Sequence, residues 1–539
     1  MRMRGRPRTD PTTNTMTLIH RLATFAGGAA LVALAGACNP DLNITNPNNP
    51  DVARAISTPG DVRQLIGSSY NTWYLSMQSG FAVGEPDPGL ATGVMADSWT
   101  MAFGNFAARF NGQEPRLAFN NSSGSTDDNL VLGPYNGLYG ALGSANDGLS
   151  AIKRGVVIKV SATAPDETPE MQALAVLVQA LSMGFEAQVF DKGFVVDEDT
   201  PGGTATLQPY AAVSAAAVAK FDKAISLAAG KAWTIPVEFT PGMVLTADKF
   251  SRMANTMAAR QLAYTPRTAA ENAAVNWTKV LAYAEKGIST GSAPFELTVT
   301  GDANNWYDLD KAYQNAGWAR VDQRVVQLFD PSQPVVFTSY TDVPGKPVSD
   351  DARLASDFTY TTAIPNQSWF SRGEWFFSFL VHTRYGYTAR GMPTQYTGDL
   401  PFVLPAENDL LIAEALVRTG GDKARAATLI NKTRVGRGHL TPLTGASSNN
   451  DLLAAIFYER DIELYDTGAS QPWFDRRRID TSLTYNGLPI GNTWGFRGGS
   501  NLQKGTPRSL PLPAAELETL GLPVYTFGGD APNPVFPET

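Results

Sequence analysis

Apolar side chains recur at helical spacing over much of this chain of 539 residues. The clearest case follows Pro134, where successive apolar residues are three or four positions apart: Tyr135, Leu138, Leu142, Ala145, Leu149 and Ile152. Such spacing places an apolar stripe along one side of a helix. Similar patterns predict helices over residues 58–80, 174–189, 210–229, 246–264, 268–287, 405–419 and 423–434. The hydrophobic pattern therefore predicts a mainly α protein.

The helices predicted over 405–419 and 423–434 are separated only by Gly420-Gly421-Asp422. Small residues lie where the two helices would cross, and glycine permits a sharp turn between them. A hairpin of about thirty residues with these features resembles one tetratricopeptide unit. Because no clean period appears elsewhere, the sequence predicts degenerate helical-hairpin repeats stacked as a superhelix.

Two stretches lack helical spacing. Residues 81–133 are rich in Gly, Asn, Ser and Asp, so we expect a long loop around an apolar island at 99–104. Residues 301–400 contain 18 Trp, Tyr and Phe. Within them, residues 375–379 are typical of a buried strand. The region 291–404 is therefore predicted to be an irregular, partly β subdomain.

The N-terminal segment has the pattern of a secretory signal. Residues 22–34 form an apolar run too short to cross a bilayer, and small residues lead from it to Cys38, the only cysteine. An unpaired thiol has no structural use in an oxidising compartment, so we interpret Cys38 as a lipid acceptor. Plain secretion and a buried free cysteine remain the alternatives, and translation could start at Met1 or Met16. An Asn- and Pro-rich tether then covers residues 38–57.

Charge narrows the possible partners. The chain has 43 basic and 51 acidic residues, and removal of residues 1–37 leaves 38 against 50, a net charge of −12. Such a surface repels phosphate, which argues against nucleic acid and leaves the lipid as the only membrane attachment. With His382 and His439 as the remaining histidines, a Cys/His zinc site cannot be built. We predict no cofactor, although oxygen-ligated Ca²⁺ stays open.

Several segments in a fixed order resemble the SusD/RagB family. They include Glu459-Arg460-Asp461-Ile462-Glu463-Leu464-Tyr465, followed by residues 473–477, and they also include residues 277–286, 411–415, 430–434 and 508–513. The chain departs from the family pattern at Tyr135, at Asp461-Ile462 and over residues 467–472, all positions that concern packing. The resemblance implies an outer-membrane surface lipoprotein with a helical-hairpin scaffold and an irregular ligand-binding segment. It also implies a TonB-dependent, SusC-like transporter as the partner.

Exposed rings could form the ligand site. Trp99, Trp306 and Trp318 lie among Gly, Asn or Asp, so we expect them to be exposed and to stack on the apolar faces of sugars. Asn305 and Arg320 could fix hydroxyl groups. The alternative for each ring is a place in the core of an irregular subdomain. Either an oligosaccharide or a peptide would suit such a surface.

Catalytic interpretations are weaker. Gly287-Ile288-Ser289-Thr290-Gly291 matches a nucleophile pattern, but a helix precedes it where the nucleophile elbow needs a strand. Glu459 and Asp475 could serve a glycosidase, but neighbouring arginines favour structural ion pairs. We therefore assign no catalytic residue and no metal ligand. The alternatives to a binding protein are a surface glycan hydrolase and a helical-repeat adaptor that binds proteins.

The sequence thus predicts a signal peptide over 1–37, a tether over 38–57, a helical region over 58–290, an aromatic-rich ligand-binding region over 291–404, and a second helical region with a tail over 405–539. Its predicted function is to bind a nutrient, an oligosaccharide in the first instance, and to deliver it to the transporter without catalysis. The expected location is the outer membrane, lipid-anchored and exposed at the cell surface.

Overall fold

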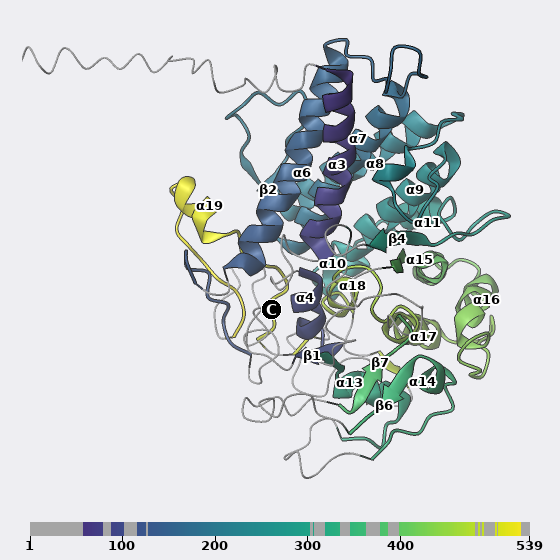
Figure 1. The fold of residues 1–539 in the computed structure, drawn as a ribbon. Coiled ribbons are helices and arrows are strands. Elements are labelled where there is room, and N and C mark those ends of the chain that lie inside the picture. The colour runs from purple at the N-terminus through teal and green to yellow at the C-terminus, as the bar shows by residue number, and fades with distance from the viewer. Residues whose placement is uncertain are drawn as a thin grey trace, which may run out of the picture. The chain divides into compact units, whose positions relative to one another are not determined.

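The structure is a computed structural model, and it describes residues 58–78, 88–101, 116–125, 128–301, 306, 319–334, 345–362, 378–385, 398–479, 483–485, 488–489, 502–503 and 505–529. Its N-terminal part is built from long helices that stand side by side: α3 (Pro59–Gln78), α6 (Asn129–Lys153), α7 (Thr168–Val189), α8 (Tyr210–Ala228) and α9 (Ala247–Tyr264) (Figure 1). Each packs against the next along the chain. The helices predicted over 58–80, 174–189, 210–229 and 246–264 are confirmed.

Helix α7 lies at the centre of this group and is buried almost all round. Small residues allow its neighbours to approach closely. A side chain at Gly184 would meet Gln261 of α9, and one at Gly148 of α6 would meet Ile66 of α3. Because only glycine leaves room for these contacts, the helix axes come close enough to exclude water from the core.

Two of the predicted helices are corrected. Helix α6 begins at Asn129 rather than Pro134, because Leu130 and Val131 are fully buried and anchor an extra turn. The helix predicted over 268–287 is divided into α10 (Ala269–Ala273) and α11 (Trp277–Ala284). Asn276 causes the break, since its side chain accepts a hydrogen bond from the Lys279 amide and caps α11.

The stretch predicted as a long loop contains regular structure. Helix α4 (Pro88–Met95) and strand β1 (Trp99–Met101) lie within it. All residues of α4 are buried, so the pattern of one polar and one apolar face that marks most helices is absent from its sequence. The prediction of an irregular segment is therefore wrong at 88–101.

The C-terminal part holds α15 (Pro405–Arg418), α16 (Lys423–Arg434), α17 (Asn449–Ile462), α18 (Gln471–Arg476) and α19 (Ala514–Thr519). The hairpin of α15 and α16 is confirmed, with Asp422 capping α16 through the Arg425 amide. Helix α15 packs against α11 and α9, and this contact joins the C-terminal helices to the N-terminal ones.

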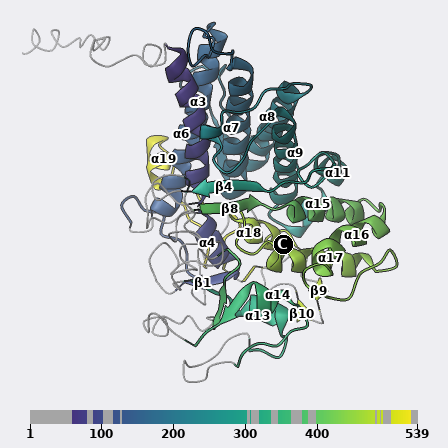
Figure 2. The same ribbon diagram turned by 45° about the vertical axis from the view of Figure 1, so that its right-hand side comes forward.

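The described strands are short and pair two by two, always antiparallel. The pairs are β1 with β5 (Ala319–Val321), β2 (Lys192–Phe194) with β3 (Leu207–Pro209), β4 (Leu297–Gly301) with β8 (Gly398–Val403), β6 (Phe358–Tyr360) with β7 (Leu380–His382), and β9 (Thr484–Tyr485) with β10 (Leu488–Pro489). Figure 2 shows β4 and β8 between the N-terminal helices and the region of α4, α13 (Gln323–Phe329) and α14 (Arg353–Ser356). Of the strand predicted over 375–379, residues 375–377 lie outside the described residues, and Ser378 and Phe379 come just before β7.

The apolar interior has two main parts. The larger one joins the N-terminal helices to α15, α16 and α18. The second lies beneath β1, β5, α13 and β6 and reaches Tyr458, Ile462 and Tyr465 of the α17 region. Within the described residues, no helix has both the length and the apolar character needed to cross a membrane.

Candidate ligand-binding face

The pairing of β1 with β5 joins two segments that the sequence analysis assigned to one site. Trp99 lies opposite Val321, Thr100 opposite Arg320, and Met101 opposite Ala319. The early segment and the aromatic-rich region therefore meet, although more than two hundred residues separate them in the sequence. The face around this pair of strands, α13 and β6 is the candidate site.

Trp99 is buried, contrary to the expectation of exposure. Only 4% of its surface is accessible, and its indole Nε1 donates a hydrogen bond to the Leu90 carbonyl at 3.0 Å. The ring lies over Gly93 of α4, where any side chain would clash with it, and its centroid is 6.1 Å from that of Tyr465. Trp99 therefore packs α4 onto the second core and cannot offer a face to a ligand in this arrangement.

Trp306 is also buried, with 7% of its surface accessible. Its ring centroid lies 5.5 Å from that of Tyr70 and 5.3 Å from that of Tyr74, both on α3. Its backbone has a positive φ of 56°, which turns the chain so that the ring can enter the main core. The predicted exposure of Trp306 is therefore wrong.

The remaining predicted site residues divide into two groups. Arg320 lies within β5 with 4% of its surface accessible, and burial lowers its pKa to about 10. Because it is enclosed, it does not reach solvent, where it was expected to bind hydroxyl groups of a ligand. Trp318, Asn305 and Cys38 lie outside the described residues. Their predicted roles stay predictions.

A small hollow on this face brings together side chains that could hold a polar ligand. We call it the α13 hollow, and its lining includes Gln323, Gln333, Gly345, Tyr360 and Phe379. The rings of Tyr360 and Phe379 have centroids 6.3 Å apart and are tilted by 56°. Its volume is about 10 Å³, enough for roughly one water molecule. A larger ligand would therefore have to lie across its mouth.

The polar groups of the α13 hollow are held in place. The Gln323 amide donates to the Pro334 carbonyl at 2.8 Å, and the Gln333 amide donates to the Gly345 carbonyl at 3.2 Å. Gln333 and Tyr360 are half-buried and so reach the surface. Gln323 and Phe379 are buried, with 1% and 6% of their surface accessible, so of these four side chains one amide and one ring can meet a ligand. An amide beside a ring provides the mixture of hydrogen-bonding and apolar contacts that sugar and peptide sites use. These residues were not predicted from the sequence, since isolated glutamines carry no spacing signal, although both rings lie in the aromatic-rich region.

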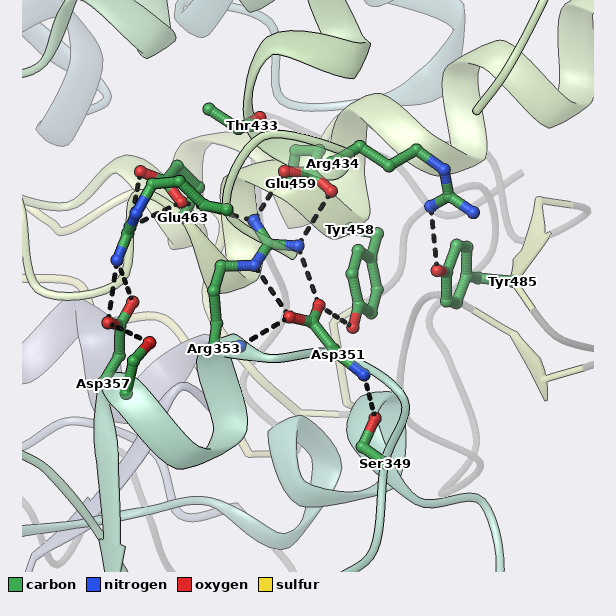
Figure 3. Close-up of polar contacts among 12 residues, drawn as sticks. Ser349, Asp351, Arg353, Asp357, Thr433, Arg434, Tyr458, Glu459, Glu463 and Tyr485 are labelled. Atoms are coloured by element: carbon green, nitrogen blue, oxygen red, sulfur yellow. Dashed lines mark hydrogen bonds and ion pairs between the residues drawn. The ribbon is translucent and has the colours of Figure 1, made fainter. Parts of the chain in front are cut away.

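A buried ionic network fixes the segment that leads into β6 (Figure 3). Arg353 of α14 donates to Asp351 at 2.8 Å and to the two oxygens of Glu459 at 2.6 and 3.0 Å. The Tyr458 hydroxyl donates to Asp351 at 2.7 Å. Since α17 carries both Tyr458 and Glu459, the network attaches residues 349–357 to that helix.

The same network continues to the start of β6. Arg437 donates to both oxygens of Asp357, at 2.8 and 3.0 Å, and to Glu463 at 2.8 Å. Burial alone would lower the pKa of Arg437, but the attraction of Glu463 and Asp357 outweighs it, and the pKa is raised. These contacts hold the start of β6, and therefore Tyr360, in position.

A second network lies beneath β1 and β5. Arg324 of α13 binds Asp461 with two hydrogen bonds of 2.7 and 2.8 Å. Asp97, just before β1, accepts from Arg116 at 2.5 Å and from Arg476 at 2.9 Å. Burial, and then the nearby Asp97, raises the pKa of Asp322 to about 7. The strands of the candidate face thus rest on charged groups that are paired below the surface.

Glu459 and Asp475 have the structural roles predicted for them. The side chain of Glu459 is fully enclosed and paired with Arg353, and Asp475 accepts from Arg460 and Arg478 at 3.2 and 2.5 Å. Ser289 follows α11 and accepts a hydrogen bond from Asn408, so no strand precedes it. Neither carboxylate faces a cleft, as a glycosidase would require.

Among the described residues, no group of three or more His, Cys, Asp or Glu side chains is placed to hold a metal ion. A cavity of about 30 Å³ lies among the N-terminal helices, lined by residues that include Trp73, Phe185, Phe221, Arg260 and Phe402. It has room for roughly two water molecules, too little for a sugar.

Comparison with known proteins identifies the fold. No family model and no curated protein matches the chain. Among solved structures, it is similar to a SusD homolog from Bacteroides thetaiotaomicron at 17% identity, covering 86% of this chain and 96% of that one with a TM-score of 0.57. It is also similar to a SusD superfamily protein from Parabacteroides distasonis at 13% identity, covering 86% of this chain and 98% of that one with a TM-score of 0.58. A third similar structure is surface glycan-binding protein A from Bacteroides uniformis, at 15% identity, covering 86% of this chain and 98% of that one with a TM-score of 0.55. The chain has the SusD fold, so the mainly α, partly β fold class is confirmed.

Proposed function

We propose that this protein binds a glycan at the cell surface without cleaving it and passes the glycan to a TonB-dependent, SusC-like transporter in the outer membrane. The observation that carries the proposal is the shared fold, which extends over 86% of the chain in the comparison with a surface glycan-binding protein. The enclosure of Glu459 and Asp475 by arginines supports a binding role over hydrolysis.

The candidate ligand surface is the α13 hollow with its surroundings. At its mouth, Tyr360 offers apolar ring surface and Gln333 offers an amide, while the buried Phe379 and Gln323 lie behind them. Glycan recognition combines these two kinds of contact, because a sugar ring has an apolar face and a rim of hydroxyl groups. The binding is expected to be weak, since the surface is small and partly polar.

The first prediction concerns Tyr360. Affinity electrophoresis first screens a panel of purified oligosaccharides for the best ligand. Calorimetry then measures the affinity of the protein for that ligand. Tyr360→Ala is expected to weaken binding by about tenfold, which corresponds to about 1.4 kcal/mol, because it removes a half-buried ring at the mouth of the hollow. Gln333→Ala is expected to weaken it in the same direction.

Phe295→Ala provides the matched control. Phe295 is also half-buried, but it lies against Lys249 and Arg252 of α9, outside the candidate face. Its replacement is expected to leave the affinity unchanged. Equal affinity of the wild-type protein and the Tyr360 variant for the ligand would show that the binding site lies elsewhere. Release of reducing ends from the ligand would instead favour a hydrolase.

The second prediction concerns attachment. If Cys38 carries the lipid, Cys38→Ser is expected to move the protein from the membrane fraction to the soluble fraction of cells, because no other anchor is proposed. Mass spectrometry of the wild-type protein should find a lipid-modified N-terminal cysteine. A wild-type protein that begins upstream of Cys38 and lacks lipid would refute this attachment, while leaving glycan binding open.

A further inference from the structure

Glu186, near the end of α7, is a deeply buried acid. Only 2% of its surface is accessible, and neither carboxylate oxygen has a hydrogen bond of normal geometry to any described residue. The Tyr139 hydroxyl interacts with Glu186 and itself accepts a hydrogen bond from the Phe194 amide at 2.6 Å. A carboxylate in this position would be costly if charged, because it has lost water and gained no full replacement.

The groups that face Glu186 come from several elements. Asp191 follows the helix end, and Glu516 comes from α19; both add negative charge. Tyr139 and Tyr135 come from α6, and Tyr135 also lies beside Glu516. Gly193 of β2 lies so close that a side chain there would meet Glu186 Cγ at 2.9 Å.

The nearest basic groups are engaged by other partners. Lys192 Nζ lies 3.7 Å from an oxygen of Asp191. Arg267 donates to the carbonyls of Ala187 and Phe190, at 2.8 and 3.0 Å, and forms its hydrogen bonds away from Glu186. Within the described residues, Glu186 forms no ion pair. Its surroundings therefore favour the neutral acid.

The C-terminal segment 505–529, which we call the strap, is fastened at this point. The Leu510 amide donates to the Val189 carbonyl at 2.8 Å, and the Asp191 amide donates to the Leu510 carbonyl at 3.3 Å. The Tyr525 hydroxyl donates to Asp191 Oδ1 at 2.7 Å. The strap thus depends on the last turn of α7, which also carries Glu186.

We propose that Glu186 holds a proton when the strap is closed, and that release of this proton to solvent loosens the strap. The resulting carboxylate would lie near Asp191 and Glu516 with no cation bound to it. Repulsion among these carboxylates can be relieved by outward movement of the strap, which includes α19 and Glu516. The segment would then be a clasp that is sensitive to pH. This inference does not depend on the ligand of the protein.

The direction of the pH effect follows from the geometry. Burial, followed by Asp191 and Glu516, raises the pKa of Glu186 well above its ordinary value, and Tyr139 offsets this only in part. A raised pKa means that the folded state binds the proton more tightly than the unfolded state. The stabilising effect is therefore full below the unfolded value of 4.5 and is lost as the pH rises toward the folded value.

Hydrogen exchange of the full chain tests the proposal. Mass spectrometry gives the protection factor of residues 506–512, corrected for the intrinsic pH dependence of exchange. In the wild-type protein this factor is expected to fall by about tenfold or more between about pH 6 and pH 8.5, since each unit of pKa difference corresponds to a factor of ten. In Glu186→Gln, which is neutral at every pH, the factor is expected to stay high and constant.

The matched control is Glu518→Gln, which removes one charge from the exposed side of α19. It is expected to retain the wild-type pH dependence. The same pH dependence in Glu186→Gln would overturn the proposal, and so would restoration of wild-type protection at high pH by Ca²⁺ or Na⁺, which would indicate a cation site. If the Gln variant does not fold, the infrared band of a protonated carboxyl group in the wild-type protein decides, because its absence at neutral pH would contradict a neutral Glu186.

Discussion

Glu414→Gln is expected to lower the free energy of unfolding by about 3–5 kcal/mol, the range found when one partner of a buried ion pair is removed. Glu414 of α15 is fully buried and binds three arginines: Arg478 at 2.8 and 2.9 Å, Arg460 at 2.6 Å and Arg418 at 2.7 Å. Glutamine has the same shape, so the change removes charge and leaves little cavity. The guanidinium groups would remain buried with one carboxylate fewer. Urea denaturation followed by circular dichroism measures the difference.

The pH dependence of this variant is a second readout. Burial alone would raise the pKa of Glu414, but Arg478, Arg460 and Arg418 overcome it and hold the pKa well below the ordinary 4.5. Its stabilising effect is therefore present above about pH 4.5 and is lost as the pH falls toward the folded value. The gap between wild type and variant should narrow on acidification.

Glu285→Gln is the control for Glu414. Glu285 pairs with Arg425 at 2.5 Å, but both side chains are partly exposed. A pair of this kind contributes about 0–1 kcal/mol, so the control should differ little from wild type. Similar losses for Glu285→Gln and Glu414→Gln would contradict the importance assigned to burial.

Arg353→Met is expected to have an effect of similar size, about 3–5 kcal/mol, because it leaves Asp351 and Glu459 buried without their cation. Methionine replaces the apolar stem and not the charge. The loss should be largest near neutral pH and smaller under mildly acidic conditions, where the stranded carboxylates can take up protons. Thermal unfolding at several pH values measures both effects.

Arg353→Lys separates charge from geometry. An ammonium group retains the charge but cannot donate to two carboxylates in the planar arrangement seen in Figure 3. Its stability is expected to lie between wild type and Arg353→Met. Since the network holds β6, both variants should also bind the glycan ligand less tightly. Wild-type stability in Arg353→Met would show that the network is not required for the fold.

The scaffold was predictable because its information is local. The positions that make α3, α7, α8, α9, α15 and α16 amphipathic or buried lie within each helix, and capping residues such as Asp422 lie beside them. Helix α4 was missed because it is buried on every side, and its burial depends on residues far away in the sequence. Asp475 was predictable as an ion-paired residue because Arg478 lies three residues away, whereas Glu459 pairs with Arg353, which is distant in the sequence.

The candidate site was much less predictable. Trp99 and Trp306 have polar and glycine neighbours in the sequence, which suggested exposure, but what covers a ring is decided by distant partners. Trp99 is covered by Tyr465, and Trp306 by Tyr70 and Tyr74. No local pattern contains these pairings. The α13 hollow likewise joins α13, β6 and the residues before β7, which meet only after folding.

The buried strap has a consequence for how the chain matures. Residues 506–512 are buried against earlier parts of the chain: the Leu510 amide donates to the Val189 carbonyl of α7, and Trp473 and Arg477 donate to the Pro507 and Arg508 carbonyls. Until this stretch docks, the folding polypeptide exposes the groove that the stretch will fill. The domain can therefore close only with its C-terminal segment in place, and a chain truncated before residue 505 is expected to aggregate.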